Sequence, residues 1–153
     1  MPLDGFSVPP DLAIAIWLEA RKTTAQRQDA ATLRRRPAPS AEILARRAAM
    51  ARESLIALGL LEKLLGGDGK NWIQDDSTDG YGGYCLHGGL RRVRAIRQCG
   101  DHAGVYLHRA IAKVSRGEPI IHFNDSRLSF AEIRAAITLA RKLAREVADG
   151  RAA

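Results

Sequence analysis

The segment that follows Ser129 repeats its apolar residues with the period of an α-helix. They are three or four positions apart, which places them on one stripe. In front of the stripe, Ser129-x-x-Glu132 is a capping box, in which each side chain is expected to satisfy a free amide at the helix start. The stripe consists of Phe130, Ile133, Ile137, Ala140, Ala144 and Val147. This pattern predicts a long amphipathic helix, which has to bury its stripe against other helices.

Three more segments have a helical pattern. Ser40 is the expected cap of a long helix that ends before Gly66-Gly67, and Asp101 is the expected cap of a later one. Another helix is predicted from about Cys85 to Gln98. The expected buried positions of the three helices are Leu44, Ala48, Ala51, Leu55 and Leu58; then Leu86, Leu90, Val93 and Ile96; then Leu107, Ile111 and Val114.

Non-helical segments separate these helices. Residues 68–83 are rich in glycine, aspartate and asparagine, which predicts a loop with one short strand at most, at Trp72-Ile73. Ile120, Ile121 and Phe123 predict a second short strand after Gly117-Glu118-Pro119. Aromatic residues make up only 5% of the chain, so alanine and leucine on helices must build the core. The expected fold class is mainly α, a compact domain of four to five helices with at most a small two-stranded β element.

Prolines and charge suggest where the domain begins. Asp11 predicts the start of an N-terminal helix through the apolar residues 12–18, which is followed by a polar, basic stretch. Pro37-Ala38-Pro39 then interrupts any helix, since proline lacks the amide donor. We expect residues 1–39 to form an N-terminal helix with a basic arm or linker, residues 40–148 a helical core domain, and residues 149–153 a disordered tail.

The chain has the features of a cytoplasmic protein. Its longest apolar run, residues 12–18, is far shorter than the roughly 20 residues needed to cross a bilayer. The first eight residues lack a basic residue and do not resemble a secretory signal. Two cysteines, Cys85 and Cys99, are too few for a disulfide-built secreted scaffold, although they could form one disulfide. We expect no membrane association.

Positive charge is the feature that bears most on function. The formal net charge is +7, and arginine outnumbers lysine by 19 to five. Arginine pairs with phosphate or carboxylate through a planar, two-point fork. The charge is uneven: residues 1–20 sum to −3, 21–52 to +7, 53–83 to −4, 84–100 to +4 and 101–153 to +3. An acidic partner would use such blocks, although a genome rich in G and C also enriches arginine.

Three arginine groupings are therefore the candidate binding residues. A solvated helix face is the ordinary explanation for any one of them, but three together favour an anionic partner, either nucleic acid or an acidic protein surface. We find no helix-turn-helix pair and no RNA-binding sheet signature. The groupings are Arg91, Arg92 and Arg94; Arg134, Arg141 and Arg145; and Arg34, Arg35 and Arg36.

Cys85 is a candidate nucleophile. A thiol at a helix N-terminus is activated, His87 or His122 could act as the base, and Asn124 could orient that base. The alternative is a small buried cysteine, with Asn124-Asp125 as turn residues. No local signature of known thiol enzymes surrounds Cys85. We favour the buried cysteine and a protein that is not an enzyme.

A zinc site is the second chemical candidate. Cys85-x-His87 and Cys99-x-x-His102 supply the residue types that zinc prefers. Residues two apart on a helix point away from each other, however, which makes Cys85 and His87 a poor pair. We expect two unrelated cysteines in a helical core, and neither a metal nor a cofactor.

The order of several short motifs resembles a bacterial and phage family of uncharacterised domains. Its members carry a tryptophan before a loop, an aromatic-Cys-x-x-Gly-Ala-Leu helix, an aromatic-Asn-Asp turn and a Thr/Ser-x-x-Glu-Val helix. The matching residues here are Trp72, Tyr84-Cys85-Leu86-His87-Gly88-Gly89-Leu90, Phe123-Asn124-Asp125 and Ser129-x-x-Glu132-Ile133. The match spans roughly residues 45–147 and departs at Gly89, where the family has alanine, and in a shorter loop at residues 75–83. The resemblance supports the domain boundary and implies no known activity.

The sequence therefore favours a small helical accessory or regulatory protein that binds an anionic partner through arginine-rich helix faces. An enzyme with Cys85 as nucleophile and a histidine base is the first alternative. A domain that forms homodimers or larger homo-oligomers through its alanine-leucine stripes is the second.

Overall fold

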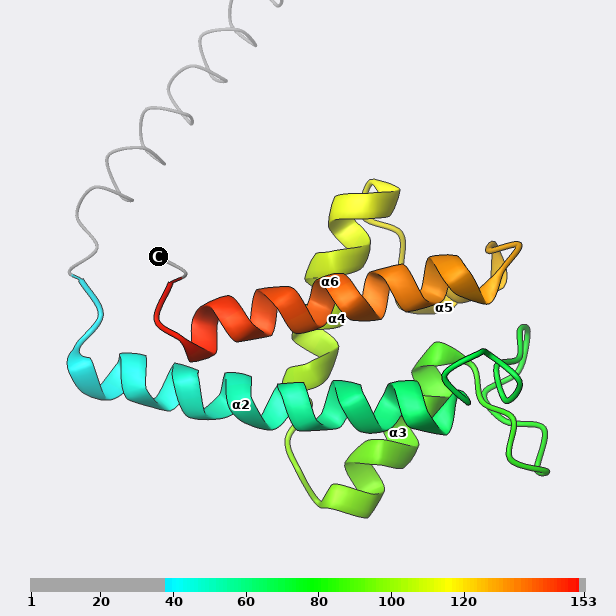
Figure 1. Ribbon diagram of the computed structural model, residues 1–153, viewed down its shortest axis with the longest axis horizontal. Helices are drawn as coiled ribbons and strands as arrows, with labels where there is room; N and C mark the ends of the chain where they lie inside the picture. The colour runs from blue at the N-terminus through cyan, green and yellow to red at the C-terminus, as the bar shows by residue number, and fades with distance from the viewer. Residues whose placement is uncertain (1–37, 152–153) are drawn as a thin grey trace, which may run out of the picture. The chain divides into compact units, whose positions relative to one another are not determined.

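The computed structural model describes residues 38–151, and it is helical (Figure 1). The chain divides into two units, Met1–Pro39 and Ser40–Ala153, and the described helices all belong to the second. The predicted N-terminal helix and Arg34, Arg35 and Arg36 lie outside the described residues. The helices are α2 (Ala41–Leu64), α3 (Leu86–Arg97), α4 (His102–Ser115), α5 (Ile120–Asp125) and α6 (Phe130–Ala148). The mainly α fold class is confirmed. Residues 38–151 contain isolated β-bridges at Trp72, Thr78 and Tyr84 but no sheet.

The ends of α2 follow from local sequence. Ser40 is the N-cap, and its hydroxyl accepts a hydrogen bond from the Ile43 amide at 3.3 Å. The helix ends before Gly66 and Gly67, which have positive φ angles of 95° and 67°. Glycine adopts such angles with little strain because it lacks a Cβ atom. Both predicted boundaries are confirmed.

The core forms where α2, α4 and α6 meet. Figure 1 shows α2 and α6 side by side, running in opposite directions, with α4 crossing behind them. The alanines of α6 let these helices approach closely, and the aliphatic residues fill the space between them. The core side chains on these three helices include Ala51, Leu58, Leu61, Leu107, Ala110, Ile111, Ile133, Ile137, Ala140 and Ala144.

The segment after Pro119 is a helix, and the predicted strand there is wrong. Ile120, Phe123 and Asn124 are buried at the spacing of one helix face, while Ile121 is half-exposed. A short apolar run does not separate a strand from a buried helical turn, and packing decided this case. The α5 helix contacts both α3 and α4.

Arg127 holds the junction between α5 and α6. Its guanidinium lies 2.7 Å from a carboxylate oxygen of Glu118 and 3.7 Å from one of Glu132. It also lies over the Phe123 ring, 4.4 Å from the ring centre. Since Glu118 precedes α5 and Glu132 is in the first turn of α6, this one side chain ties the two helix starts together.

Some sequence predictions about single side chains are wrong. Leu44, Ile96 and Val114 were expected in the core but are half-exposed or more. The capping box of α6 does not form: the Ser129 side chain makes no cap hydrogen bond, and the Glu132 carboxylate accepts the Leu128 amide instead. Among the residues described, no helix is both long and apolar enough to span a membrane.

Candidate functional site

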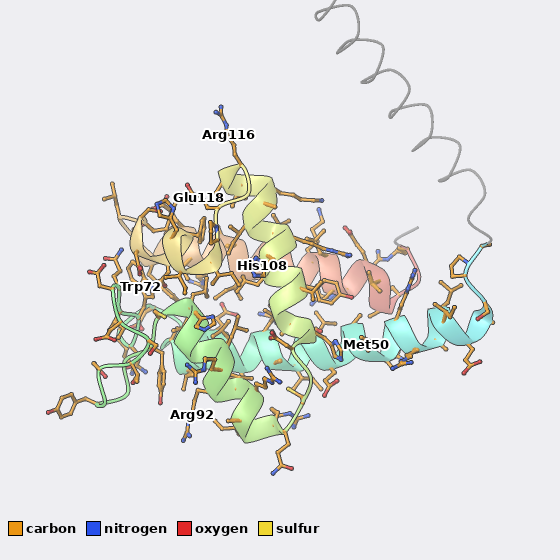
Figure 2. The ribbon with its side chains drawn as sticks, turned by 180° about the vertical axis from the view of Figure 1, so that it is seen from behind. Met50, Trp72, Arg92, His108, Arg116 and Glu118 are labelled. Atoms are coloured by element: carbon orange, nitrogen blue, oxygen red, sulfur yellow. The ribbon has the colours of Figure 1, made fainter. Side chains whose placement is uncertain are left out.

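The arginines of α3 form the most basic exposed surface on a single helix. Leu86, Leu90 and Val93 bury one face of α3, which leaves the arginines in solvent. Figure 2 shows Arg92 extending away from the helices. The helix contains no acidic residue, and none of its arginines forms an ion pair with any residue in the described range. We call this the α3 arginine face, made of Arg91, Arg92 and Arg94; Arg97 is also exposed, but it follows Leu90 and Val93 on the stripe that is buried earlier in the helix.

Two shallow hollows adjoin the α3 arginine face. One, of about 340 Å³, lies between the helix start and the preceding loop, where Ser77 and Thr78 line it together with Arg91 and Arg92. The other, of about 380 Å³, is lined by Arg91 and Arg94 near the end of the helix. Arg91 borders both. Guanidinium groups beside hydroxyls supply the donors that phosphate and carboxylate oxygens accept from.

In the acidic loop before α3, residues 68–83, backbone amides donate hydrogen bonds to carboxylates. One carboxylate oxygen of Asp79 accepts hydrogen bonds from the amides of Tyr81 and Gly83, both at 2.8 Å. These bonds lower the pKa of Asp79, because they stabilise its charged form. The Asp125 carboxylate likewise accepts the Asp75 amide at 3.0 Å. These two carboxylates thus fix the loop conformation.

The second predicted grouping, on α6, is partly neutralised. Glu62 of α2 lies between two of its members, at 3.5 Å from Arg134 and 2.8 Å from Arg141. Arg145 is exposed and forms no ion pair with a described residue. Arg134 also lines a broad hollow of about 610 Å³ together with Lys142 and Asp68, so that hollow carries charge of both signs. Arg134 and Arg141 therefore link α6 to α2, whereas Arg145 contributes only to the surface.

Cys85 is buried, as the sequence suggested. It is the N-cap of α3, it is only 5% exposed, and its sulfur accepts the Gly88 amide at 3.3 Å. Within residues 38–151 the thiol makes no hydrogen bond to a histidine, and His122 lies exposed on α5. The predicted base and nucleophile are therefore not brought together.

Asn124 is the residue whose role sequence reasoning missed. It is fully buried, and its side-chain oxygen accepts from the Trp72 indole at 2.8 Å and from the Leu86 amide at 3.0 Å. Its amide nitrogen donates to the Ile73 carbonyl at 3.1 Å and to the Asp125 carboxylate at 2.8 Å. Asn124 therefore joins the loop, α3 and α5, and is not free to orient a catalytic base. The aromatic-Asn-Asp motif was the available signal.

The candidate zinc ligands lie at two ends of one helix. Cys85 caps the start of α3, while Cys99 and His102 follow its end. A helix of 12 residues is about 18 Å long, which is too far for shared coordination or for a disulfide. Both thiols are free. Residues 38–151 bring no three histidine, cysteine, aspartate or glutamate side chains together as a metal site.

Comparison of the chain with protein-family models, with curated proteins and with solved structures found no match in any of the three. The geometry of the molecule is therefore the ground for a functional proposal.

Proposed function

We propose that the protein is a small accessory or regulatory protein that binds nucleic acid through the α3 arginine face. The observation that carries the proposal is the set of four exposed arginines on a helix without acidic residues and without ion pairs in the described part of the chain. Free guanidinium groups can pair with phosphates at little cost, because no internal ion pair has to be broken first. The two hollows along α3 offer room for phosphate oxygens beside Arg91.

The size of the surface limits the expected affinity. Each phosphate that a protein neutralises contributes about −0.9 to the slope of log K against log salt for duplex DNA. The few arginines of α3 therefore support weak, salt-sensitive binding without sequence readout, unless residues elsewhere add contacts. This is the behaviour of an accessory factor and differs from that of a sequence-specific regulator.

The experiment measures binding of the full chain to duplex DNA and to RNA over a range of salt concentrations. Changing both Arg91 and Arg94 to alanine should lower the salt slope by about one unit per lost contact. The matched control changes Arg46 and Arg52 to alanine, which removes the same charge from exposed positions on α2. That control should leave the slope almost unchanged.

Two outcomes would refute nucleic acid as the partner. One is equal weakening by the two double variants, which would mean attraction to net charge alone. The other is no binding at about 50 mM salt, where phosphate contacts are strong. An acidic protein surface would then be the partner to seek, with the Arg91 and Arg94 variant as the negative bait in a pull-down.

We also propose kinship with the bacterial and phage family that the motifs resemble, and a cytoplasmic location. Supporting the first, Trp72, Leu86 and Asn124 belong to one hydrogen-bond network, so the separate motifs would act as one structural unit. In support of the second, Cys85 and Cys99 are both free thiols, as is usual in a reducing compartment.

A further inference from the structure

A groove of about 450 Å³ lies between the first half of α2, the first turns of α4 and the end of α6. Figure 2 shows Met50 of α2 beside the first turns of α4, which form the opposite wall. The groove shares no lining residue with the hollows of the α3 arginine face. We call it the α2–α4 groove; its lining is Leu44, Arg47, Ala48, Met50, His102, Val105, Tyr106, Arg109, Val147 and Gly150.

The lining of the α2–α4 groove includes exposed aliphatic side chains. Leu44 on α2 and Val105 on α4 each keep 50% of their surface in contact with solvent. Ile43, which precedes Leu44 on α2, is 47% exposed, and residues 41–47 are all exposed within the described structure. Exposed aliphatic side chains along a groove provide apolar surface that a partner can bury.

A buried tyrosine also lines the groove. Tyr106 is only 8% exposed, yet its hydroxyl forms no hydrogen bond with any residue in the described range. Tyr106 is one of the residues that line the groove. Burial raises the pKa of Tyr106, and the charge of Arg109 acts in the opposite direction. The tyrosine is therefore a neutral donor beside a guanidinium.

The charge of the groove has one sign. Arg47 on α2 and Arg109 on α4 stand on opposite walls, His102 lies at the start of α4, and the lining contains no carboxylate. Neither arginine forms an ion pair with a residue in the described part of the chain. An occupant has to combine aliphatic groups with negative charge.

We propose that the α2–α4 groove binds an acidic amphipathic helix of another protein. The apolar face of that helix covers Leu44, Val105 and Val147. A carboxylate at the border of this face pairs with Arg109 and accepts a hydrogen bond from Tyr106. Helices bind such grooves through apolar residues at i, i+3, i+4 and i+7. Nucleic acid lacks an aliphatic face, and a small ligand in the groove would leave the neighbouring Ile43 exposed. This inference does not depend on the function proposed for α3.

The test uses the full chain labelled with ¹⁵N and an unlabelled synthetic helix of about four turns, with leucines on one face and glutamates beside them. A matched peptide carries glutamine in place of every glutamate. We expect amide shifts at Leu44, Val105 and Tyr106 with the acidic peptide, and affinity lower by about tenfold with the neutral one, as for loss of a charged hydrogen bond.

Variants of the protein complete the test. Val105→Asp should lower the affinity for the acidic peptide by at least about tenfold. Val114→Asp, on the same helix and at a position of 54% exposure, should not lower it. Tyr106→Phe removes only the hydroxyl and should weaken binding by several-fold. Leu44→Asp and Ile56→Asp form a second matched pair on α2, at positions of 50% and 52% exposure. Leu44 lines the groove and Ile56 does not, so only Leu44→Asp should lower the affinity. Circular dichroism confirms that each variant is folded.

Several results would overturn the proposal. They are no shifts at up to about 1 mM peptide, shifts confined to α3, equal binding of the neutral peptide, or equal effects of Val105→Asp and Val114→Asp. Shifts of the same residues with decanoate at similar affinity would indicate a small-ligand pocket instead. Self-association that Val105→Asp abolishes would make the groove an interface between two copies of this chain.

Discussion

Asn124 shows how much one side chain can determine in a small helical protein. Its four hydrogen bonds reach Trp72, Ile73, Leu86 and Asp125, so loop, α3 and α5 meet at one buried amide. Gln74 strengthens the same junction by donating to the carbonyl groups of three residues, Asn124, Asp125 and Arg127. A buried polar group with every partner in place specifies one arrangement, because each alternative leaves donors unsatisfied.

Removal of this amide should therefore destabilise the fold strongly. We expect Asn124→Ala to lower the free energy of unfolding by about 3 kcal/mol, because the Trp72 indole and the Leu86 amide lose their buried acceptor. Asn71→Ala is the matched control, since its half-buried amide donates one hydrogen bond, to the Leu64 carbonyl. That change should cost about 1 kcal/mol in urea denaturation. Equal losses for the two variants would contradict the role of Asn124.

At the level of single elements, α3 depends on two adjacent glycines for different reasons. A Cβ added to Gly88 would lie 1.8 Å from the carbonyl oxygen of Ser77, which is backbone of the preceding loop. A Cβ on Gly89 would lie 2.7 Å from the end of the Leu61 side chain on α2. Backbone gives way at far greater cost than the tip of a leucine. The first glycine thus sets the distance between helix and loop, and the second only the packing on α2.

Alanine at the two positions should separate these roles. Gly88→Ala should destabilise the protein by about 3 kcal/mol, the upper range for overpacking. At Gly89 the strain against Leu61 is offset by the preference of helices for alanine, which is worth about 0.5–1 kcal/mol, so the midpoint of thermal unfolding should change little. Full stability of Gly88→Ala would show that the loop around Ser77 moves freely.

On the scale of the whole molecule, all described core residues belong to the unit that begins at Ser40. The buried cluster runs from Ala51 to Ala144 and receives side chains from each of the five helices. Arg127 and Asn124 close the connections between these helices within the same unit. The described residues after Pro39 thus share one hydrophobic core.

A fragment of residues 40–153 should accordingly fold without the N-terminal residues. We expect cooperative unfolding with an enthalpy of about 0.7 kcal/mol per residue near 60 °C. Far-UV circular dichroism and the fluorescence of Trp72 should report the same transition. A gradual or probe-dependent transition would contradict the boundary at Ser40 and require residues from the N-terminal part for stability.

Local signals in the sequence determined where the long helices lie. Ser40 and the Gly66-Gly67 pair fixed the ends of α2, and the stripe after Ser129 fixed the buried face of α6. These features act over one or two helical turns, within which capping, glycine conformation and apolar period are properties of neighbouring residues. The loop at residues 68–83 was predictable for the same reason.

Only the tertiary structure decided which of these elements meet. Ile120–Asp125 is helical because Ile120 and Phe123 are buried together, whereas its short apolar run fits a strand equally well. Glu62 forms an ion pair with Arg141, a member of the predicted α6 grouping that lies 79 residues later in the chain. Asn124 accepts a hydrogen bond from Trp72, which lies 52 residues earlier. A sequence pattern carries no record of such distances. Contacts between remote residues depend on how all the helices pack together. In the described range these contacts pair Arg134 and Arg141 of α6 with Glu62 and leave the α3 arginines without ion pairs.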